Sequence, residues 1–125
     1  MSVTLLIVDD SMTMRAVIKK VVQMSGFEAE AYLEAGSGAD AIEVLAKEKV
    51  DLVLSDINMP EMSGIEMLRK IKADPGLSSI PVIMISTEGS EERISEAQES
   101  GAAGYLKKPF QPEEVRALLD ENLGG

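Results

Sequence analysis

The stretch Val3–Asp10, which reads VTLLIVDD, joins a largely apolar run to two acidic residues. Further apolar runs lie at Leu52–Leu54, at Val82–Ile85 and around Tyr105-Leu106. Such runs are typical of strands that are buried on both faces of a parallel sheet. A weaker alternation at Glu28–Glu34 predicts an additional strand at an edge of the sheet. The chain is therefore expected to contain five strands.

Helical patterns alternate with these strands. Ser37 and Ser90 are predicted to cap helices, Gly26 to end the first helix and Pro112 to open the last one. A further helix is predicted over Glu91–Ser100, although few of its residues are apolar. The other apolar stripes, with repeats of three and four residues, lie within 14–22, 65–71 and 115–119.

The alternation of strands and helices predicts an α/β fold with a parallel sheet that is covered on both faces, because the crossover connections are right-handed. No linker, low-complexity tract or internal repeat interrupts the chain. Residues 1–125 are expected to form a single domain. The ending Asn122–Gly125 is typical of a completed helix terminus and favours a stand-alone protein.

Composition excludes several kinds of chemistry. The chain has no Cys and no His, which excludes disulfides, thiol nucleophiles, imidazole bases and the usual zinc ligands. A net charge of -10 repels phosphate backbones and anionic lipids, so we expect no direct contact with nucleic acid or membrane. No apolar stretch is long enough to span a bilayer, and no basic segment opens a secretory signal. We expect a cytosolic protein whose chemistry uses oxygen ligands and lysine.

Carboxylates follow two of the predicted strands. Asp9 and Asp10 follow the first apolar run, and Asp56 follows the run that begins at Leu52. Taken alone, the first pair is typical of a helix cap with a solvated acid, and Asp56 is typical of a turn. The carboxyl ends of parallel strands share one edge of a sheet, however, and three carboxylates there repel one another unless a cation is bound. Oxygen ligands favour Mg²⁺, Mn²⁺ or Ca²⁺.

Two further groups are expected at the same edge. Ser86 and Lys108 follow apolar runs, and a hydroxyl and an ammonium beside a metal-bound carboxylate can bind the oxygens of a phosphoryl group. By itself, Lys108 is typical of a solvated surface lysine. A cis peptide bond between Lys108 and Pro109 would direct the lysine inward.

The ordered motifs of the chain resemble those of the receiver domain of two-component response regulators, over essentially its whole length. The motifs that carry the resemblance are Leu6-Ile7-Val8-Asp9-Asp10-Ser11, Asp56-Ile57-Asn58-Met59-Pro60 with Gly64, Ile85-Ser86, and Gly104-Tyr105-Leu106-Lys107-Lys108-Pro109-Phe110. The resemblance is closest to the single-domain chemotaxis regulators of that family. It implies a flavodoxin-like, doubly wound (βα)5 sandwich with a five-stranded parallel sheet in the order 2-1-3-4-5.

The resemblance implies a role for each matching residue. Asp56 would accept a phosphoryl group from the phosphohistidine of a histidine kinase. Mg²⁺ would be bound by Asp10, Asp56 and the backbone carbonyl of Asn58, and by Asp9 through a water molecule. Lys108 would pair with the phosphoryl oxygens.

The resemblance also implies a switch. Ser86 would hydrogen-bond the phosphoryl group and move inward with its loop, and Tyr105 would then turn inward. Thr87 is larger than the alanine of the best-known chemotaxis regulators, and its bulk is predicted to hinder that rotation. Asn58 and Glu88 flank the phosphoryl site at positions that tune hydrolysis in this family. Both match the pattern of rapid self-dephosphorylation.

The function implied is a phosphorylation-driven switch that presents an altered surface to a protein partner. That surface comprises the fourth helix, fifth strand and fifth helix, and a flagellar motor switch is one candidate partner. A phosphatase is a further candidate partner. Arg15, Lys19 and Lys20 are interpreted as a solvated helix face, although such faces also meet kinases and phosphatases in this family. The chain would be no enzyme beyond gaining and losing its own phosphoryl group.

Two alternatives remain open. The chain could be a phosphorelay intermediary that passes the phosphoryl group to another histidine-containing protein. It could also be an aspartate-nucleophile phosphatase of the haloacid dehalogenase type. That second alternative is opposed by Asn58, where such a phosphatase needs an acid, and by a nucleophile that does not follow the first strand.

Overall fold

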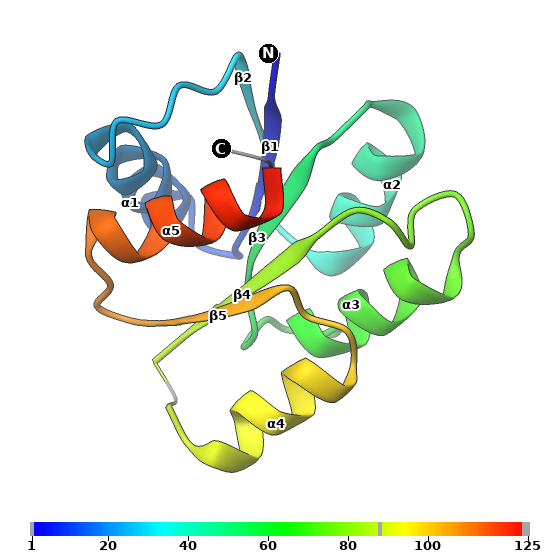
Figure 1. Ribbon diagram of the computed structural model, residues 1–125. Coiled ribbons are helices and arrows are strands. Elements are labelled where there is room, and N and C mark those ends of the chain that lie inside the picture. The colour runs from blue at the N-terminus through cyan, green and yellow to red at the C-terminus, as the bar shows by residue number, and fades with distance from the viewer. Residues whose placement is uncertain (1, 88, 124–125) are drawn as a thin grey trace.

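The computed structural model describes residues 2–87 and 89–123. Its centre is a parallel sheet of five strands in the order β2-β1-β3-β4-β5 (Figure 1), which confirms the expected fold class and strand order. Glu88, one of the two residues predicted to tune hydrolysis, lies outside the described residues, as do Gly124 and Gly125 of the predicted helix terminus. The strands are β1 (Thr4–Val8), β2 (Ala31–Ala35), β3 (Leu52–Asp56), β4 (Val82–Ser86) and β5 (Gly104–Lys107).

Helices cover both faces of the sheet (Figure 1). Buried residues of α1 and α5 pack in one hydrophobic cluster, whereas buried residues of α2, α3 and α4 belong to the other. In the described part of the chain no helix has the length and apolar character needed to cross a membrane. The helices are α1 (Met12–Met24), α2 (Gly38–Lys47), α3 (Gly64–Ala73), α4 (Glu91–Glu99) and α5 (Pro112–Leu123).

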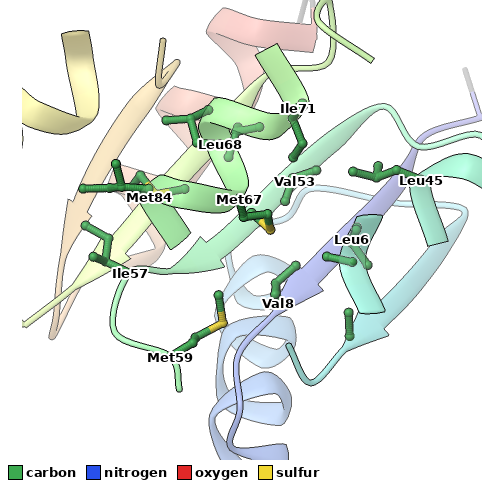
Figure 2. Close-up of a cluster of buried hydrophobic side chains, with 14 of the residues drawn as sticks. Leu6, Val8, Leu45, Val53, Ile57, Met59, Met67, Leu68, Ile71 and Met84 are labelled. Carbon is green, nitrogen blue, oxygen red and sulfur yellow. The ribbon is translucent and has the colours of Figure 1, made fainter. Parts of the chain in front are cut away.

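Strand residues divide between the two clusters by alternation. In β1, Leu6 and Val8 point into the cluster under α2 and α3, and Leu5 and Ile7 point into the cluster under α1 and α5. Figure 2 shows the first of these clusters, where Met67 and Met84 fill the space between sheet and helix. Successive strand residues face opposite sides of the sheet, so an apolar run without alternation is needed to bury both.

Most of the predicted helix boundaries are confirmed. The side chains of Ser37 and Ser90 accept hydrogen bonds at the starts of α2 and α4, and α5 begins at Pro112. Gly26 follows α1 with a φ of 84°, a left-handed conformation in which a side chain would be strained. The helix predicted over Glu91–Ser100 is α4, which ends one residue earlier, and its Ala97 is fully buried.

The edge strand begins later than the sequence predicts. The prediction placed it at Glu28–Glu34, whereas β2 spans Ala31–Ala35. Parallel pairing sets this boundary, because Ala31 is the partner of Thr4, the first residue of β1. Residues 28 and 29 therefore precede the ladder, and the local alternation could not reveal where the partner strand begins.

Candidate functional site

Three carboxylates meet at the carboxyl end of the sheet. Val8 pairs with Ser55, so Asp9, the next residue after β1, lies beside Asp56, the last residue of β3. One oxygen from each of Asp9, Asp10 and Asp56 lies within 4.8 Å of the other two. Asp9 and Asp56 are buried, whereas Asp10 is exposed. The structure thus brings together the three acids that the sequence predicted.

Local hydrogen bonds hold Asp9 but engage only one of its two carboxylate oxygens among the described residues. Its backbone N–H donates to the carbonyl of Ala35 at 3.2 Å, and its Oδ1 accepts from the N–H of Ser11 at 2.9 Å. Its Oδ2 is buried and accepts no hydrogen bond from any described residue. The N-cap of α1 is Ser11, which accepts from Met14 N–H, so the cap interpretation of the acidic pair is wrong. The acids are left available for a ligand.

The backbone at Asp56 is fixed by small residues. The buried hydroxyl of Ser55 donates to the Asp56 carbonyl at 2.9 Å. Gly64 lies directly against that carbonyl, and its N–H donates to the carbonyl of Ile57 at 2.8 Å. A Cβ at Gly64 would collide with the Asp56 carbonyl oxygen, so only glycine fits there. Asp56 is a strand residue rather than a turn residue, and the turn interpretation is wrong.

Lys108 lies over the carboxylates. Its Nζ is 3.4 Å from Asp56 Oδ1, within hydrogen-bonding distance, and 3.7 Å from Asp9 Oδ2, an ion pair that is too long for a hydrogen bond. Its backbone N–H donates to the carbonyl of Ser86 at 2.7 Å. The Lys108-Pro109 peptide bond is cis, and the lysine side chain is only 17% exposed. Interpreting Lys108 as a solvated surface lysine is therefore wrong.

Charge and burial act in opposite directions on Asp56. Burial raises the pKa of its carboxyl above the ordinary 3.8, the Lys108 ammonium lowers it, and the Asp9 carboxylate raises it again. The pKa is raised on balance. Burial and the Asp9 carboxylate therefore disfavour the anionic form of Asp56, and a bound divalent cation would favour it.

The predicted switch residues lie at the end of β4 and on the neighbouring strand β5. Asp56 pairs with Ile85 in the ladder, so Ser86 extends one residue further along β4, where it is fully buried. Thr87 is exposed, and Tyr105 is partly buried against the cluster under α2, α3 and α4. Asn58 is exposed in the loop after β3.

Sequence reasoning missed two residues of the site. The hydroxyl of Ser55 donates to the Asp56 carbonyl. The signal in the sequence was a serine that directly follows an apolar run. Arg15 was assigned to a solvated face, but its side chain is only 16% exposed and donates to the Asp9 carbonyl at 2.7 Å. No local sequence pattern predicted the contact between Arg15 and the Asp9 carbonyl. Lys20 is exposed as predicted, and the Nζ of Lys19 lies 5.2 Å from the centre of the Tyr32 ring.

Lys108 also lines an apolar groove. The groove has a volume of about 340 Å³ and lies between α1 and the segment that follows β5. The exposed large apolar residues of the described chain, Met12, Val17 and Met24, all belong to α1. The residues that line the groove are Met14, Val17, Val21, Thr87, Lys108, Pro109 and Phe110.

The donor set and geometry fit a hard divalent cation. A buried carboxylate oxygen without a hydrogen bond, a raised pKa and three converging acids are the features that such a cation satisfies. Residues 5–120 match the family described as the response regulator receiver domain. The chain belongs to this family, and it is accordingly a signalling domain of the response regulator type.

Individual relatives indicate which kind of receiver domain this chain resembles. A chemotaxis protein CheY homolog of Campylobacter jejuni is 39% identical over 121 residues, which are 96% of this chain and 92% of the relative. Chemotaxis protein CheY-3 of Vibrio cholerae is 41% identical over 117 residues, which are 94% of this chain and 88% of the relative. The solved structure of Vibrio cholerae chemotaxis protein CheY4 has a TM-score of 0.84 and 32% identity, and the match covers 98% of this chain and 99% of that one. The chain is thus a CheY-like receiver domain.

Proposed function

We propose that this chain is a phosphorylation-activated switch of a two-component system and that Asp56 is its phosphoacceptor. A histidine kinase would supply the phosphoryl group as phosphohistidine. The observation that carries the proposal is the pairing of the buried Asp56 carboxylate with the Lys108 ammonium, 3.4 Å away, at the mouth of the acidic cluster. A nucleophile and a group that binds the incoming oxygens are thereby adjacent.

In the transfer step an Asp56 carboxylate oxygen attacks phosphorus. The P–O bond forms while the P–N bond to the donor imidazole breaks, and the electron pair of that bond returns to the imidazole nitrogen. Lys108 would bind the phosphoryl oxygens, which carry the negative charge of the transition state. In a separate hydrolysis step, water would attack the phosphorus of the aspartyl phosphate. The P–O bond to Asp56 would break, which restores the carboxylate and releases inorganic phosphate, at a rate set in part by Asn58 and Glu88.

Mg²⁺ is the proposed cofactor. Asp10, Asp56 and the carbonyl of Asn58 would bind it directly, and Asp9 would bind through a water molecule. When bound, the ion would neutralise the acids and polarise the phosphoryl group. The hydrogen-bond acceptor left over at Asp9 Oδ2 supports this assignment. The chain's own part is to hold the acids at the edge of the sheet and Lys108 opposite them.

The proposed output starts at Ser86. The aspartyl phosphate would add about 1.5 to 2 negative charges, which would draw the Ser86 hydroxyl and its loop inward. Tyr105 would follow, against the hindrance expected from Thr87. The altered face of α4, β5 and α5 would then bind a protein partner. The chemotaxis names of the relatives favour a motility partner such as a flagellar motor switch.

The apolar groove beside Lys108 is the proposed contact for the phosphodonor. A donor histidine must approach Asp56 closely, and the groove is lined by Lys108, whose Nζ lies 3.4 Å from Asp56 Oδ1. Exposed Met12 and Val17 on α1 would add apolar area to such a contact. A phosphatase partner would reach the site from the same direction.

The proposal is tested with the intact chain, Mg²⁺ and acetyl phosphate. Intact-mass spectrometry is expected to find one added phosphoryl group on the wild-type chain and none on Asp56→Asn. Asp40→Asn is the matched control, because Asp40 is an exposed acid on α2, and it is expected to behave as wild type. Uptake by Asp56→Asn, or no uptake by the wild type, would refute the proposal. Sustained turnover of a phosphomonoester would favour a phosphatase instead.

A further inference from the structure

Arg15 joins three segments around the acidic cluster. It lies in the first turn of α1, where its backbone N–H donates to the Ser11 carbonyl. Its Nη1 donates to the Asp9 carbonyl at 2.7 Å, and its Nε donates to Glu34 Oε1 on β2 at 2.8 Å. One guanidinium thus connects α1, the end of β1 and the end of β2. Its planar set of donors can make both bonds at once, which an ammonium on a flexible stem does less well.

The bond to the Asp9 carbonyl acts on both neighbouring acids. That carbonyl belongs to the peptide between Asp9 and Asp10, so holding it fixes the plane from which the Asp10 side chain departs. Asp10 is exposed, and its carboxylate gains no rigidity from burial. At Asp9, the N–H and Oδ1 are also engaged, which leaves Oδ2 as the carboxylate oxygen without a hydrogen bond from the described residues. Hydrogen bonds to the backbone and to Asp9 Oδ1 therefore hold the two acids in position.

Glu34 fixes the orientation of the guanidinium. Its side chain is 43% exposed, and ion pairs between exposed side chains are weak because water and salt screen them. The pair therefore contributes little to stability. What it does provide is direction, because a guanidinium held at Nε by Glu34 presents Nη1 to the Asp9 carbonyl.

We propose that Arg15 is a positioning residue for the divalent cation: it holds the Asp9–Asp10 peptide so that both carboxylates are preset to bind. This inference rests on the proposed function, since it concerns the proposed Mg²⁺ site. Arg15 touches neither the phosphoryl group nor the cation in this role. Outer groups that orient metal ligands commonly change metal affinity by about 10- to 100-fold when they are removed.

The sign of the effect separates positioning from simple charge. A positive group near a cation site repels the cation, so removing it would tighten Mg²⁺ binding if charge alone mattered. Loss of positioning has the opposite effect, because the acids must then be ordered when the cation binds. Weaker binding in a variant that has lost a positive charge cannot come from Coulomb repulsion.

The test measures Mg²⁺ affinity of the full chain by isothermal titration calorimetry. Arg15→Met is expected to weaken binding about tenfold. Arg15→Lys, which keeps the charge and loses the paired donors, is expected to weaken it less, by about threefold. Arg69→Met is the control: it removes the same charge from an exposed arginine that pairs with Glu96 at 3.5 Å, and it should leave the affinity unchanged.

A second readout separates binding from chemistry. At saturating Mg²⁺ the rate of phosphoryl uptake from acetyl phosphate by Arg15→Met is expected to return to within about twofold of wild type, because only the cation concentration needed has changed. Tighter or unchanged Mg²⁺ binding by Arg15→Met would overturn the proposal. If that variant does not fold, Arg15→Lys decides, and unchanged affinity there would overturn it. Failure of the wild-type chain to bind Mg²⁺ would instead refute the proposed function.

Discussion

Charged side chains at the two ends of the sheet differ in how fully they are hydrogen-bonded. At the amino end, Asp51 Oδ2 accepts from the backbone N–H of Thr4 at 2.8 Å, where β1 begins. The ammonium of Lys72 donates to the carbonyls of Ser78 and Ile80, each at 3.0 Å, and so closes the segment between α3 and β4. Charged side chains at this end satisfy backbone groups and stabilise the fold.

At the carboxyl end the charged groups are left partly unsatisfied. Asp9 Oδ2 is buried and accepts no hydrogen bond from the described residues, and burial raises the pKa of Asp56. Lys108 approaches both acids at 3.4 and 3.7 Å, distances that are loose for an ion pair. The charged groups at the amino end of the sheet therefore stabilise the fold, whereas those at the carboxyl end retain binding capacity at a cost in stability. Perturbations at the two ends should therefore have separable consequences.

The largest expected effect is on chemistry at the carboxyl end. Lys108→Met should slow phosphoryl uptake from acetyl phosphate by about 10²- to 10³-fold at saturating Mg²⁺, because the transition-state oxygens lose their ammonium. Timed intact-mass measurements give the rate. Lys107→Met removes the same charge from the neighbouring exposed lysine and should leave the rate within about twofold. Equal slowing by both variants would show that net charge, rather than position, matters.

At the amino end the expected effect is on stability. Lys72→Met should lower the free energy of unfolding by about 1–3 kcal/mol, because the carbonyls of Ser78 and Ile80 lose a charged donor. Urea denaturation measures this. Lys70→Met, at an exposed position of the same helix, should change it by less than about 0.5 kcal/mol. Phosphoryl uptake should be unaffected by either variant, and a loss of uptake would break the separation of the two ends.

A smaller effect on stability is expected from Asp56→Asn without Mg²⁺. The pKa of Asp56 is raised in the folded state, so its contribution to stability is present below the ordinary carboxyl pKa of 3.8 and is lost as pH rises through the folded value. The amide does not ionise, and the variant should unfold at a higher temperature than wild type at neutral pH. The gain should shrink as pH falls toward 3.8.

Thermal unfolding with added Mg²⁺ provides the control for this prediction. The cation should raise the unfolding temperature of wild type more than that of Asp56→Asn, because it relieves the charge that the amide lacks. A variant that is less stable than wild type at neutral pH without Mg²⁺ would contradict the expected cost of burying Asp56 as an anion.

The smallest effect concerns Tyr32 on the edge strand β2. Its hydroxyl is buried without a hydrogen-bond partner among the described residues, and burial raises its pKa. Tyr32→Phe should leave the free energy of unfolding unchanged or raise it by up to about 1 kcal/mol, since an unpaired hydroxyl is removed. The face of the ring remains available to Lys19, whose Nζ lies 5.2 Å from its centre. A loss of more than about 1 kcal/mol in urea denaturation would mean that the hydroxyl has a partner.

Local patterns in the chain predicted much of the fold. The apolar run at Val3–Val8 contains β1, and the caps at Ser37 and Ser90 and the helix start at Pro112 are found as predicted. All four depend on neighbouring residues. The order of the strands came from the family resemblance of the motifs. The start of β2 was misplaced because it depends on where the partner strand begins.

The candidate site divides in the same way. The positions of Asp9, Asp10 and Asp56 along the chain were enough to predict that they lie at one edge of the sheet, because the carboxyl ends of parallel strands meet there. Lys108 was also expected at that edge, but its hydrogen bond to Asp56 Oδ1 was found only in the folded chain. The same holds for the contact of Arg15 with Glu34, 19 positions away. Such pairs depend on the packing of distant segments, and no periodicity along the chain encodes them. The charged residues of the site could therefore be identified from the sequence. The hydrogen bonds and ion pairs between them depend on the fold, because they join segments that are distant along the chain.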